Sequence, residues 1–506
     1  MLSPVQQEIV EQSGNMIVRA SAGTGKTHTM VNKIAYDIKK NRTHKVVAAI
    51  TFTIKAANEI KNRLTIDTTE HFIGTNNSFA IEEVVKPFIK DVFGKEYKVD
   101  MSTDYSVKVN TFAQGLVQIK ENGILGSYQD NTKNFIFQLA LKILKDSKAC
   151  QLYLQAKYFK IYVDEYQDCD KDMHKFFMYI CEKLNIETFV VGDAKQSIYM
   201  MWRGAYPKAF LSIWDKPNFS KNFMTDNYRS CQQIQNYSNL LCEETRHLFK
   251  PVNDISPVVV VCTSTNSWSK DILPYLDKSK RTALLRYSKA NAESGADELS
   301  KVGIDITYIP PSPISDITTE VAWLYNAIAK YFVLSNYSVY DVRFEIPNEV
   351  IGNKKVLTYL KRSLANLDED IKADDYAMFV KQVDMLASYF GYETREEHCQ
   401  KLYDSIVNER YHPAFKVDEL DKISITFHSS KGLEFDQVVL FASDYRLSNE
   451  EEIDNHYVAA TRAKSKLIIV YDGSWNAQKF AENINQILKQ SDLSMRDIAT
   501  VVNCSM

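Results

Sequence analysis

The stretch "VRASAGTGKTHTM" (residues 18–30) joins a short apolar run to a helical pattern through a loop of small residues. Backbone amides of such a loop, and of the helix N-terminus that follows it, point toward a bound phosphate. Lys26 supplies a positive charge for the β- and γ-phosphate oxygens, and Thr27 supplies a hydroxyl ligand for magnesium. The stretch therefore predicts a nucleoside triphosphate site. Its phosphate loop consists of Ala20, Ser21, Ala22, Gly23, Thr24, Gly25, Lys26 and Thr27.

Other apolar runs extend the same α/β pattern along the chain. Continuous apolarity over four to seven residues is typical of strands that are buried on both faces of a parallel sheet. One set of runs lies near the loop and a second set lies further on, so we predict two parallel-sheet lobes. The first set is 15–21, 45–53, 159–165 and 186–193, and the second set is 257–264, 281–288, 305–310, 422–429, 437–443 and 466–473.

A segment with a helical pattern interrupts each set of strands. We predict a helical insertion at 80–150, inside a first lobe that comprises 1–79 and 151–216. The second lobe would comprise 217–310 and 420–506, with a reduced helical insertion at 311–419. Each insertion would interrupt one lobe.

Composition narrows the class of protein without naming a partner. The chain has 506 residues and a formal net charge of −3, so composition neither indicates nor excludes a nucleic-acid partner. No apolar run approaches the length that crosses a bilayer, and the first residues lack the layout of a signal peptide. We therefore expect a cytoplasmic protein with no membrane partner.

The run "FKIYVDEYQD" (159–168) places two adjacent acids at the end of a predicted buried strand. Asp164 is placed to hold magnesium, and Glu165 to polarise the attacking water. Adjacent acids can also simply end a strand at the solvent. The phosphate loop upstream favours the catalytic interpretation.

Together with the phosphate loop and the acidic run, six other motifs along the chain resemble those of the superfamily 1 DNA helicases of the UvrD, Rep and PcrA type. The resemblance implies two RecA-like P-loop motor lobes, with ATP and Mg²⁺ in the cleft between them. It also implies that hydrolysis of ATP drives closure and opening of the lobes. The motifs are "LSPVQQEIV" (2–10), "ITFTIKAANEIKNRL" (50–64), "VVGDAKQSIYMMWRGA" (190–205), "DNYRS" (226–230), "TFHSSKGLEF" (426–435) and "YVAATRAKSKL" (457–467).

The same resemblance implies roles for residues at the nucleotide. Gln196 would contact the γ-phosphate and link it to DNA, while Arg229 and Arg462 would act as arginine fingers from the second lobe. Four further residues would bind the nucleotide: Gln6 at the adenine, Lys33 in place of an arginine that helps to read the nucleotide, Tyr228 stacked on the adenine, and Glu434 at the ribose.

DNA contacts are also implied. Phe52, Trp202 and Arg203 occupy positions where the family stacks or clamps bases, and an aromatic face tolerates any sequence. The family pattern has one residue fewer before this tryptophan, so Met200 or Met201 is extra here. The residues implied to touch the DNA backbone are Thr51, Thr53, His428 and Ser429.

Both insertions are short for a full-length helicase of this type. Four further stretches are "KPFIKDVFG" (86–94), "KNFIFQLALKILK" (133–145), "KYFKIYVDEYQDCDKDMH" (157–174) and "NYRSCQQIQNYSN" (227–239). With these stretches, the compact form resembles the helicase-like subunits of the Gabija anti-phage defence system. That resemblance implies a partner, a GajA-type ATPase-Toprim nuclease, in a hetero-oligomeric complex. Three hypotheses stay open: a DNA-activated ATPase that senses ends or single strands and regulates a nuclease, an autonomous 3′–5′ repair or replication helicase, and a binding module without hydrolysis. The residues that argue against the third are all intact: Lys26, Asp164, Glu165, Gln196, Arg229 and Arg462.

Overall fold

The computed structural model describes residues 2–197, 206–264, 267–317, 319–346 and 354–503. The chain divides into two compact units. Unit 1 comprises Met1–Met101, Val107–Leu276 and Ser430–Met506, and unit 2 comprises Ser102–Ser106 and Asp277–Ser429. This division differs from the two lobes drawn from the sequence, because unit 1 holds the whole first lobe together with part of the second.

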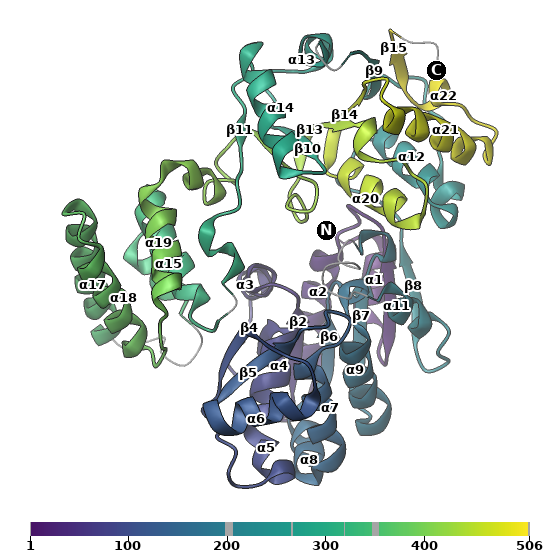
Figure 1. Cartoon of the computed structure of the whole chain (residues 1–506). Coiled ribbons are helices and arrows are strands. Elements are labelled where there is room, and N and C mark those ends of the chain that lie inside the picture. Colours follow the sequence, from purple (N-terminus) through teal and green to yellow (C-terminus); the bar gives the residue numbers. More distant parts are fainter. Residues whose placement is uncertain (1, 198–205, 265–266, 318, 347–353, 504–506) are drawn as a thin grey trace. The chain divides into compact units, whose positions relative to one another are not determined.

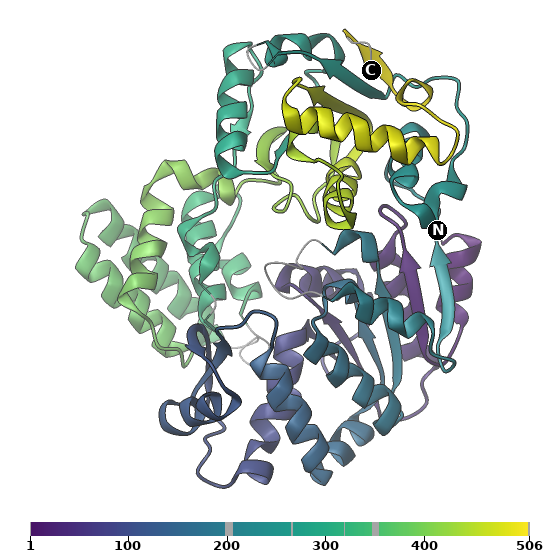
Figure 2. The ribbon, with the colours of Figure 1, turned by 45° about the vertical axis from the view of Figure 1, so that its right-hand side comes forward.

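A six-stranded parallel sheet forms the centre of the first lobe within unit 1. Its strand order is β3-β2-β6-β7-β1-β8, so β1, which leads into the phosphate loop, lies between β7 and β8. Figure 2 shows β1 in purple beside β8 in teal. The strands are β1 (Met16–Ala20), β2 (Val46–Thr51), β3 (Phe72–Thr75), β6 (Tyr158–Val163), β7 (Glu187–Gly192) and β8 (Ser220–Met224).

Helices pack around this sheet because their apolar faces match it. On α2, Met30 and Ile34 are fully buried against β-strand residues such as Val18 and Val47 in one hydrophobic cluster. The helices of the first lobe and its insertion are α1 (Pro4–Glu11), α2 (Lys26–Lys40), α3 (Ile54–Arg63), α4 (Asn76–Ala80), α5 (Lys86–Phe93), α6 (Phe112–Asn122), α7 (Phe135–Asp146), α8 (Lys148–Lys157), α9 (Lys171–Leu184) and α11 (Pro207–Trp214).

Unit 1 also contains four strands of the second set. They are β9 (Val258–Cys262), β13 (Phe435–Phe441), β14 (Ala463–Tyr471) and β15 (Thr500–Val502), in the parallel order β13-β14-β9-β15. The helices of this part, labelled in Figure 1 where space allows, are α12 (Gln232–Leu241), α13 (Trp268–Asp271), α20 (Glu450–Ala460), α21 (Trp475–Lys489) and α22 (Met495–Ile498).

Unit 2 combines three parallel strands with a helical bundle. The strand order is β11-β12-β10, with β10 (Thr282–Arg286), β11 (Thr307–Tyr308) and β12 (Lys422–Thr426). One apolar cluster, which includes Leu324, Leu364 and Phe379, fills the bundle. The helices are α14 (Lys289–Lys301), α15 (Ala322–Val333), α16 (Val339–Phe344), α17 (Lys354–Lys372), α18 (Tyr376–Tyr389) and α19 (Glu396–Val407).

The insertion at 80–150 contains strands that its helical pattern did not predict. β4 (Ser102–Val109) and β5 (Ile124–Tyr128) form a two-stranded sheet. The first residues of β4 belong to unit 2, where the buried Asp104 forms an ion pair with Arg395 and bridges the backbone at Thr319. A buried carboxylate is costly without a cation nearby. The strand at Asp104 therefore depends on Arg395, a residue far along the chain, and not on the local sequence pattern.

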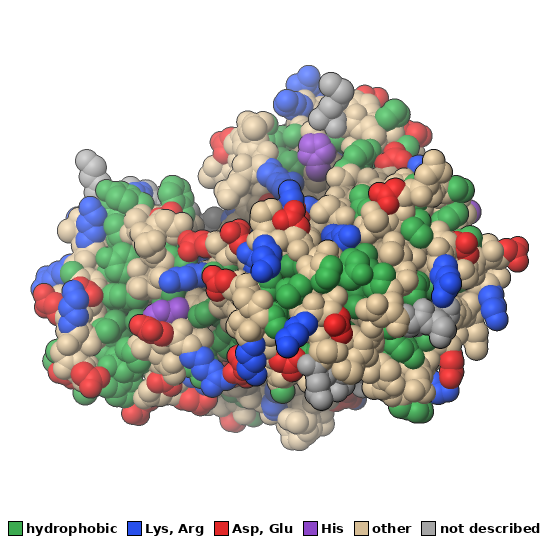
Figure 3. Space-filling model, turned by 90° about the horizontal axis from the view of Figure 1, so that it is seen from above, with side chains coloured by type: hydrophobic (Ala, Val, Ile, Leu, Met, Phe, Trp, Pro, Cys, Tyr) green, Lys and Arg blue, Asp and Glu red, His purple; other side chains and the backbone are tan. Residues whose placement is uncertain are grey.

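The surface carries no strong charge bias on the face that Figure 3 shows, where basic and acidic side chains lie among one another.

The chain adopts the parallel α/β architecture that was predicted for both sets of strands. Among the described residues, no helix combines the length and apolarity that crossing a membrane requires.

Candidate nucleotide site

The phosphate loop lies between β1 and α2, and two of its glycines adopt backbone angles that other residues rarely reach. Gly23 has φ +75° and Gly25, the N-cap of α2, has φ +80°. A Cβ on Gly23 would lie 2.3 Å from the Asn227 side-chain oxygen. The loop at Asn227 therefore packs directly on the phosphate loop, and the Tyr228 amide donates a hydrogen bond to the Gly23 carbonyl at 2.9 Å.

Gln6 is attached to the phosphate loop from the other side. Its Nε2 donates to the Thr24 carbonyl at 3.1 Å, and its Oε1 accepts from the Ser3 amide at 2.9 Å as part of a capping box on α1. The side chain is almost fully buried. This geometry holds the predicted adenine-reading amide next to the loop.

Lys33, predicted to help to read the nucleotide, is engaged by protein groups in this structure. Its ammonium is fully buried and donates to the carbonyls of Val10 at 3.1 Å and Gln12 at 2.7 Å, and it also pairs with Asp37. Burial, together with the nearby Lys160, lowers the pKa of Lys33 to about 8. The two carbonyl contacts join α2 to the end of α1, whereas the pair with Asp37 lies within α2. Lys33 therefore helps to hold the helix that carries Gln6.

The two predicted catalytic acids follow β6 and are held differently. The Asp164 amide donates to the Ile50 carbonyl at 2.9 Å, and its carboxylate accepts the Glu165 amide at 2.9 Å. Burial and the charge of Glu165 raise the pKa of Asp164 to about 7. The nearby charge of Lys26 acts in the opposite direction but only partly offsets these effects. A bound Mg²⁺ would supply further positive charge at this carboxylate.

Glu165 lies in an unusual backbone conformation with φ +48°. Burial alone would raise the pKa of its carboxyl group, but the nearby charges of Lys26 and Lys431, with a hydrogen bond from Gln167, lower it. Glu165 is therefore kept ionised. An ionised carboxylate at this position is suited to orient and deprotonate a water molecule.

Gln196 is buried. Its Nε2 donates to the Asp193 carboxylate at 2.8 Å, and its backbone carbonyl accepts from Lys431 at 3.2 Å. Lys431 also forms an ion pair with Asp168 in the acidic motif. The structure thus connects the segment around Gln196 to residues of two other predicted motifs.

Arg229 and Glu434 contact each other. The Arg229 Nε lies 2.7 Å and Nη2 lies 2.6 Å from one Glu434 oxygen, and Nη1 donates to the Thr461 carbonyl at 3.3 Å. Tyr228, by contrast, is largely exposed, with 61% of its surface accessible. The ring predicted to stack on adenine is therefore exposed to solvent. Arg229 and Glu434, predicted to contact a phosphate and the ribose, instead pair with each other.

Arg462 is buried, with 2% of its surface exposed. Its Nε donates to the Val458 carbonyl at 3.0 Å and Nη1 to the Leu433 carbonyl at 3.4 Å, while Nη2 has no hydrogen-bond partner among the described residues. Burial lowers the pKa of Arg462 to about 10, with the positive charge of Arg229 adding to the effect. An unpaired buried guanidinium nitrogen needs an anion, and a phosphate oxygen meets that need.

These residues fit ATP and magnesium. The orphaned nitrogen of Arg462 and the loop lysine suit an anionic substrate, and the buried carboxylate of Asp164 suits a divalent cation. Thr27 and Asp164 would hold Mg²⁺, which neutralises charge on the phosphate oxygens. Of the other loop residues, Ser21 accepts a hydrogen bond from Lys195, and Thr24 donates its hydroxyl to the Ser21 carbonyl.

The predicted DNA contacts come from both units. Phe52 is half-buried and Thr53 caps α3, while the Thr51 hydroxyl donates to the Thr53 carbonyl at 3.0 Å. His428 and Ser429 belong to unit 2, whereas the other three belong to unit 1. Trp202 and Arg203 lie outside the described residues.

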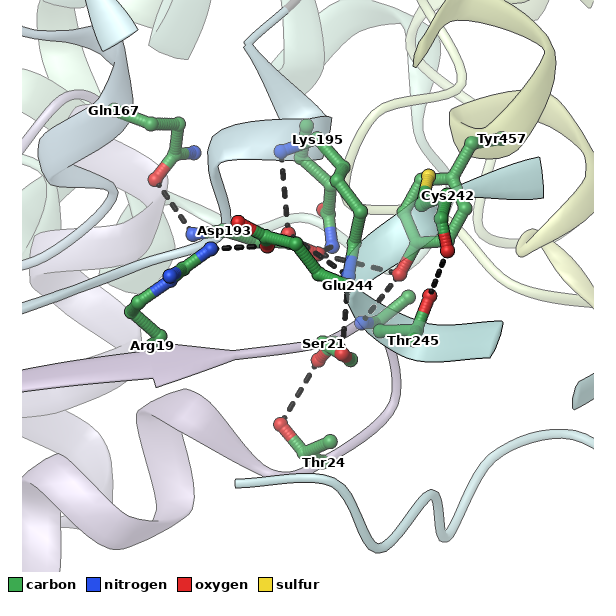
Figure 4. Close-up of polar contacts among 12 residues, drawn as sticks. Arg19, Ser21, Thr24, Gln167, Asp193, Lys195, Cys242, Glu244, Thr245 and Tyr457 are labelled. Atoms are coloured by element: carbon green, nitrogen blue, oxygen red, sulfur yellow. Dashed lines mark hydrogen bonds and ion pairs between the residues drawn. The ribbon is translucent and has the colours of Figure 1, made fainter. Parts of the chain in front are cut away.

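Three residues near the phosphate loop belong to the predicted motifs, but the sequence assigns them no role of their own: Asp193, Lys195 and Tyr457. Figure 4 shows them converging beside Ser21. Asp193 and Lys195 come from the segment after β7, and Tyr457 comes from α20. Their only sequence signal was membership of the motifs at 190–205 and 457–467, and no local pattern distinguishes them from structural residues there.

The fold and the site together define a P-loop ATPase. Comparison with known proteins identifies the family within that class. Residues 6–201 match an AAA domain family, and residues 324–474 match the UvrD-like helicase C-terminal domain. The chain belongs to the UvrD-like helicase family, and it is an ATP-dependent enzyme of that family.

Individual relatives refine this placement. The chain is 38% identical to the Gabija protein GajB of Bacillus cereus over 96% of its own length and 98% of that protein. It is 29% identical to the ATP-dependent DNA helicase PcrA of Bacillus subtilis, and 28% identical to Rep of Buchnera aphidicola from Acyrthosiphon pisum. Those two matches cover 47% and 48% of this chain, but only 39% and 45% of the helicases. The similarity to this Gabija protein thus extends over nearly the whole chain, whereas each of these two helicase matches covers about half of it.

Proposed function

We propose that this chain is a DNA-dependent ATPase that hydrolyses ATP with Mg²⁺ when it binds DNA ends or single strands. In this proposal it is the sensor and regulatory subunit of an anti-phage nuclease complex. The partner would be a GajA-type ATPase-Toprim nuclease. The full-length similarity to GajB supports the setting, and the nucleotide site supports the chemistry.

One observation carries the proposed chemistry. The guanidinium of Arg462 is buried with Nη2 unpaired, and its charge lies close enough to influence the carboxylate of Glu165. A cation and a general base held together in a water-poor site suit phosphoryl transfer to water, because the cation offsets charge that develops on the phosphate oxygens. Lys26 would neutralise the β- and γ-phosphates from the loop, and Gln196 would link the γ-phosphate to DNA.

DNA would bind through Phe52, Trp202 and Arg203 on bases and through Thr51, Thr53, His428 and Ser429 on the backbone. Base stacking on an aromatic ring is independent of sequence, which suits a protein that responds to any exposed single strand. The 311–419 segment, proposed as the reduced insertion of the second lobe, would leave this chain with less regulatory structure than a full-length helicase.

The proposal is tested in two assays with purified protein. In the first, phosphate release is measured with single-stranded DNA, with a frayed duplex and with a blunt duplex, using Lys26→Ala as the control for contaminating ATPases. We expect stimulation by DNA in the wild type alone. A rate that no DNA changes would contradict DNA dependence.

The second assay distinguishes the regulatory subunit from an autonomous 3′–5′ helicase. The chain is mixed with a GajA-type nuclease, and DNA cleavage is followed with wild type or Lys26→Ala. We expect co-elution of the two proteins and cleavage that depends on Lys26. Efficient unwinding of a 3′-tailed duplex by the chain alone, without any complex, would favour the autonomous helicase.

A further inference from the structure

Tyr457 lies where a helix of the second lobe meets the phosphate loop. Its ring is 2% exposed, and its hydroxyl accepts a hydrogen bond from the Ala22 amide at 3.1 Å. Ala22 belongs to the loop whose amides face the phosphates of a nucleotide. A side chain from α20 therefore uses one of the donors that the substrate would require.

The hydroxyl also makes a second contact. It donates to the Asp193 carboxylate at 3.3 Å, and the same oxygen of Asp193 accepts from the Gln196 side chain at 2.8 Å. Burial, followed by the charge of Asp193, raises the pKa of Tyr457 well above its usual value, so the hydroxyl keeps the proton that it donates. One hydrogen-bonded chain thus runs from Ala22 through Tyr457 and Asp193 to Gln196.

Lys195 supports this chain. Its ammonium donates to the Ser21 hydroxyl at 3.2 Å, lies 3.8 Å from Asp193, and sits 5.2 Å from the centre of the Tyr457 ring (Figure 4). The ammonium of Lys195 is attracted both to the face of the Tyr457 ring and to the negative charge of the Asp193 carboxylate. These contacts fix the position of both Asp193 and the tyrosine relative to the loop.

We infer that Tyr457 is a positioning residue that transmits occupancy of the phosphate loop to Gln196. A phosphate oxygen that accepts the Ala22 amide proton displaces Tyr457 from that donor. The loss of this contact frees the tyrosine from the loop. Because Tyr457 and Gln196 donate to the same Asp193 oxygen, a shift of the tyrosine moves that carboxylate and with it the Gln196 amide. The inference rests on the proposed role of Gln196 and adds the connection that sets its position.

Tyr457→Phe tests the inference because it removes only the hydroxyl. Without a competitor for the Ala22 amide, the KM for ATP is expected to fall by about three- to tenfold, the scale of one hydrogen bond. The ratio of kcat with and without single-stranded DNA is expected to fall toward one, because Gln196 no longer follows the loop. Phosphate release measured over an ATP titration, with and without a dT oligonucleotide, gives both values.

Tyr237→Phe is the matched control. Tyr237 is a buried tyrosine whose hydroxyl forms a hydrogen bond of 2.7 Å with His456, the residue before Tyr457 in α20. Among the described residues, its hydroxyl forms no hydrogen bond with the phosphate loop. It should lower the thermal midpoint about as much as Tyr457→Phe does, while KM and the DNA ratio stay at wild-type values. Asp193→Asn should lower the DNA ratio with a smaller change in KM.

Three results would overturn the inference. One is a Tyr457→Phe enzyme with unchanged KM and unchanged DNA ratio. Another is an increase in KM with equal losses of kcat in both conditions, which indicates a structural role only. The third is the same shifts in Tyr237→Phe. If the wild type hydrolyses ATP without DNA stimulation, the proposed DNA dependence fails, but the expected fall in KM still tests the contact between Tyr457 and Ala22.

Discussion

Arg229, in the motif at 226–230, forms an ion pair with Glu434, in the motif at 426–435; Arg229 Nη2 lies 2.6 Å from a carboxylate oxygen of Glu434. Both residues are proposed to contact the nucleotide, one at a phosphate and one at the ribose. Lys464 also lies 3.4 Å from the other Glu434 oxygen. A nucleotide that binds both side chains must therefore break the ion pair between them.

A double-mutant cycle tests this exchange. Arg229→Ala, Glu434→Ala and the double variant are unfolded with denaturant, with and without a non-hydrolysable ATP analogue. Because the pair is partly exposed, we expect a coupling of about 0.5–1 kcal/mol without nucleotide. With the analogue, the coupling should approach zero. A coupling that the analogue leaves unchanged would mean that the pair persists and that neither residue is a nucleotide ligand.

Lys26→Ala and Glu165→Gln should separate binding from hydrolysis. Lys26→Ala removes the loop cation, so both ATP binding and turnover should be lost. Glu165→Gln keeps the size of the side chain but removes the base, so ATP should bind while turnover stops. Equilibrium binding of a fluorescent ATP analogue and steady-state phosphate release measure the two effects. Near-normal turnover by either variant would place the nucleotide site elsewhere.

Arg462→Ala should lower turnover by roughly 10³-fold or more, the scale of an arginine finger. That factor corresponds to about 4 kcal/mol of transition-state stabilisation. ATP affinity should change far less, because the unpaired nitrogen is expected to act on charge that develops during the reaction. Since Arg462 is buried, Arg462→Lys, which keeps a cation there, and a thermal midpoint for each variant control for misfolding. Losses of affinity and rate by the same factor would identify Arg462 as a structural residue.

Phe52→Ala should weaken the binding of single-stranded DNA. Stacking on an aromatic ring contributes about 1–3 kcal/mol per base, so Kd should rise by about 5- to 150-fold. Fluorescence anisotropy with a labelled dT oligonucleotide at a fixed salt concentration measures it. Phe72→Leu, in β3 of the same lobe, controls for the loss of an aromatic ring outside the predicted motif. Equal Kd values for Phe52→Ala and wild type would exclude Phe52 as a stacking residue.

Asp454 should make stability dependent on pH. Burial, with the charges of Asp193, Glu450 and Glu244 outweighing the opposite effect of Lys195, raises its pKa to about 8. The folded state therefore retains a proton that the unfolded chain has released between about pH 4 and 8, so this group reduces stability as pH rises through that range. Asp454→Asn removes the effect.

The free energy of unfolding of Asp454→Asn, minus that of wild type, should consequently increase from pH 5 to pH 8. Denaturant titrations at several pH values measure this difference, and other titrating groups largely cancel between the two proteins. A constant difference over the whole range would show that Asp454 titrates normally.

The local sequence determined the parts of this protein that short-range physics controls. Uninterrupted apolar runs specified buried parallel strands, because a strand covered on both faces has no polar side. The glycines and Lys26 specified the phosphate loop, because positive φ at Gly23 and Gly25 and a cation next to the helix N-terminus are properties of a few adjacent residues. The family resemblance extended this to the order of motifs and the two-lobe fold.

Only the tertiary structure decided how residues far apart in the chain are paired. Lys33 has the residue type of a nucleotide ligand, yet packing of α1 against α2 surrounds it with the carbonyls of Val10 and Gln12. The strand β4 formed within a helical pattern, where Asp104 meets Arg395. Tyr457 and Ala22 are 435 positions apart, and no local pattern encodes their hydrogen bond. Such contacts depend on which surfaces the folded chain brings together, because a buried polar group takes whichever partner the packing supplies.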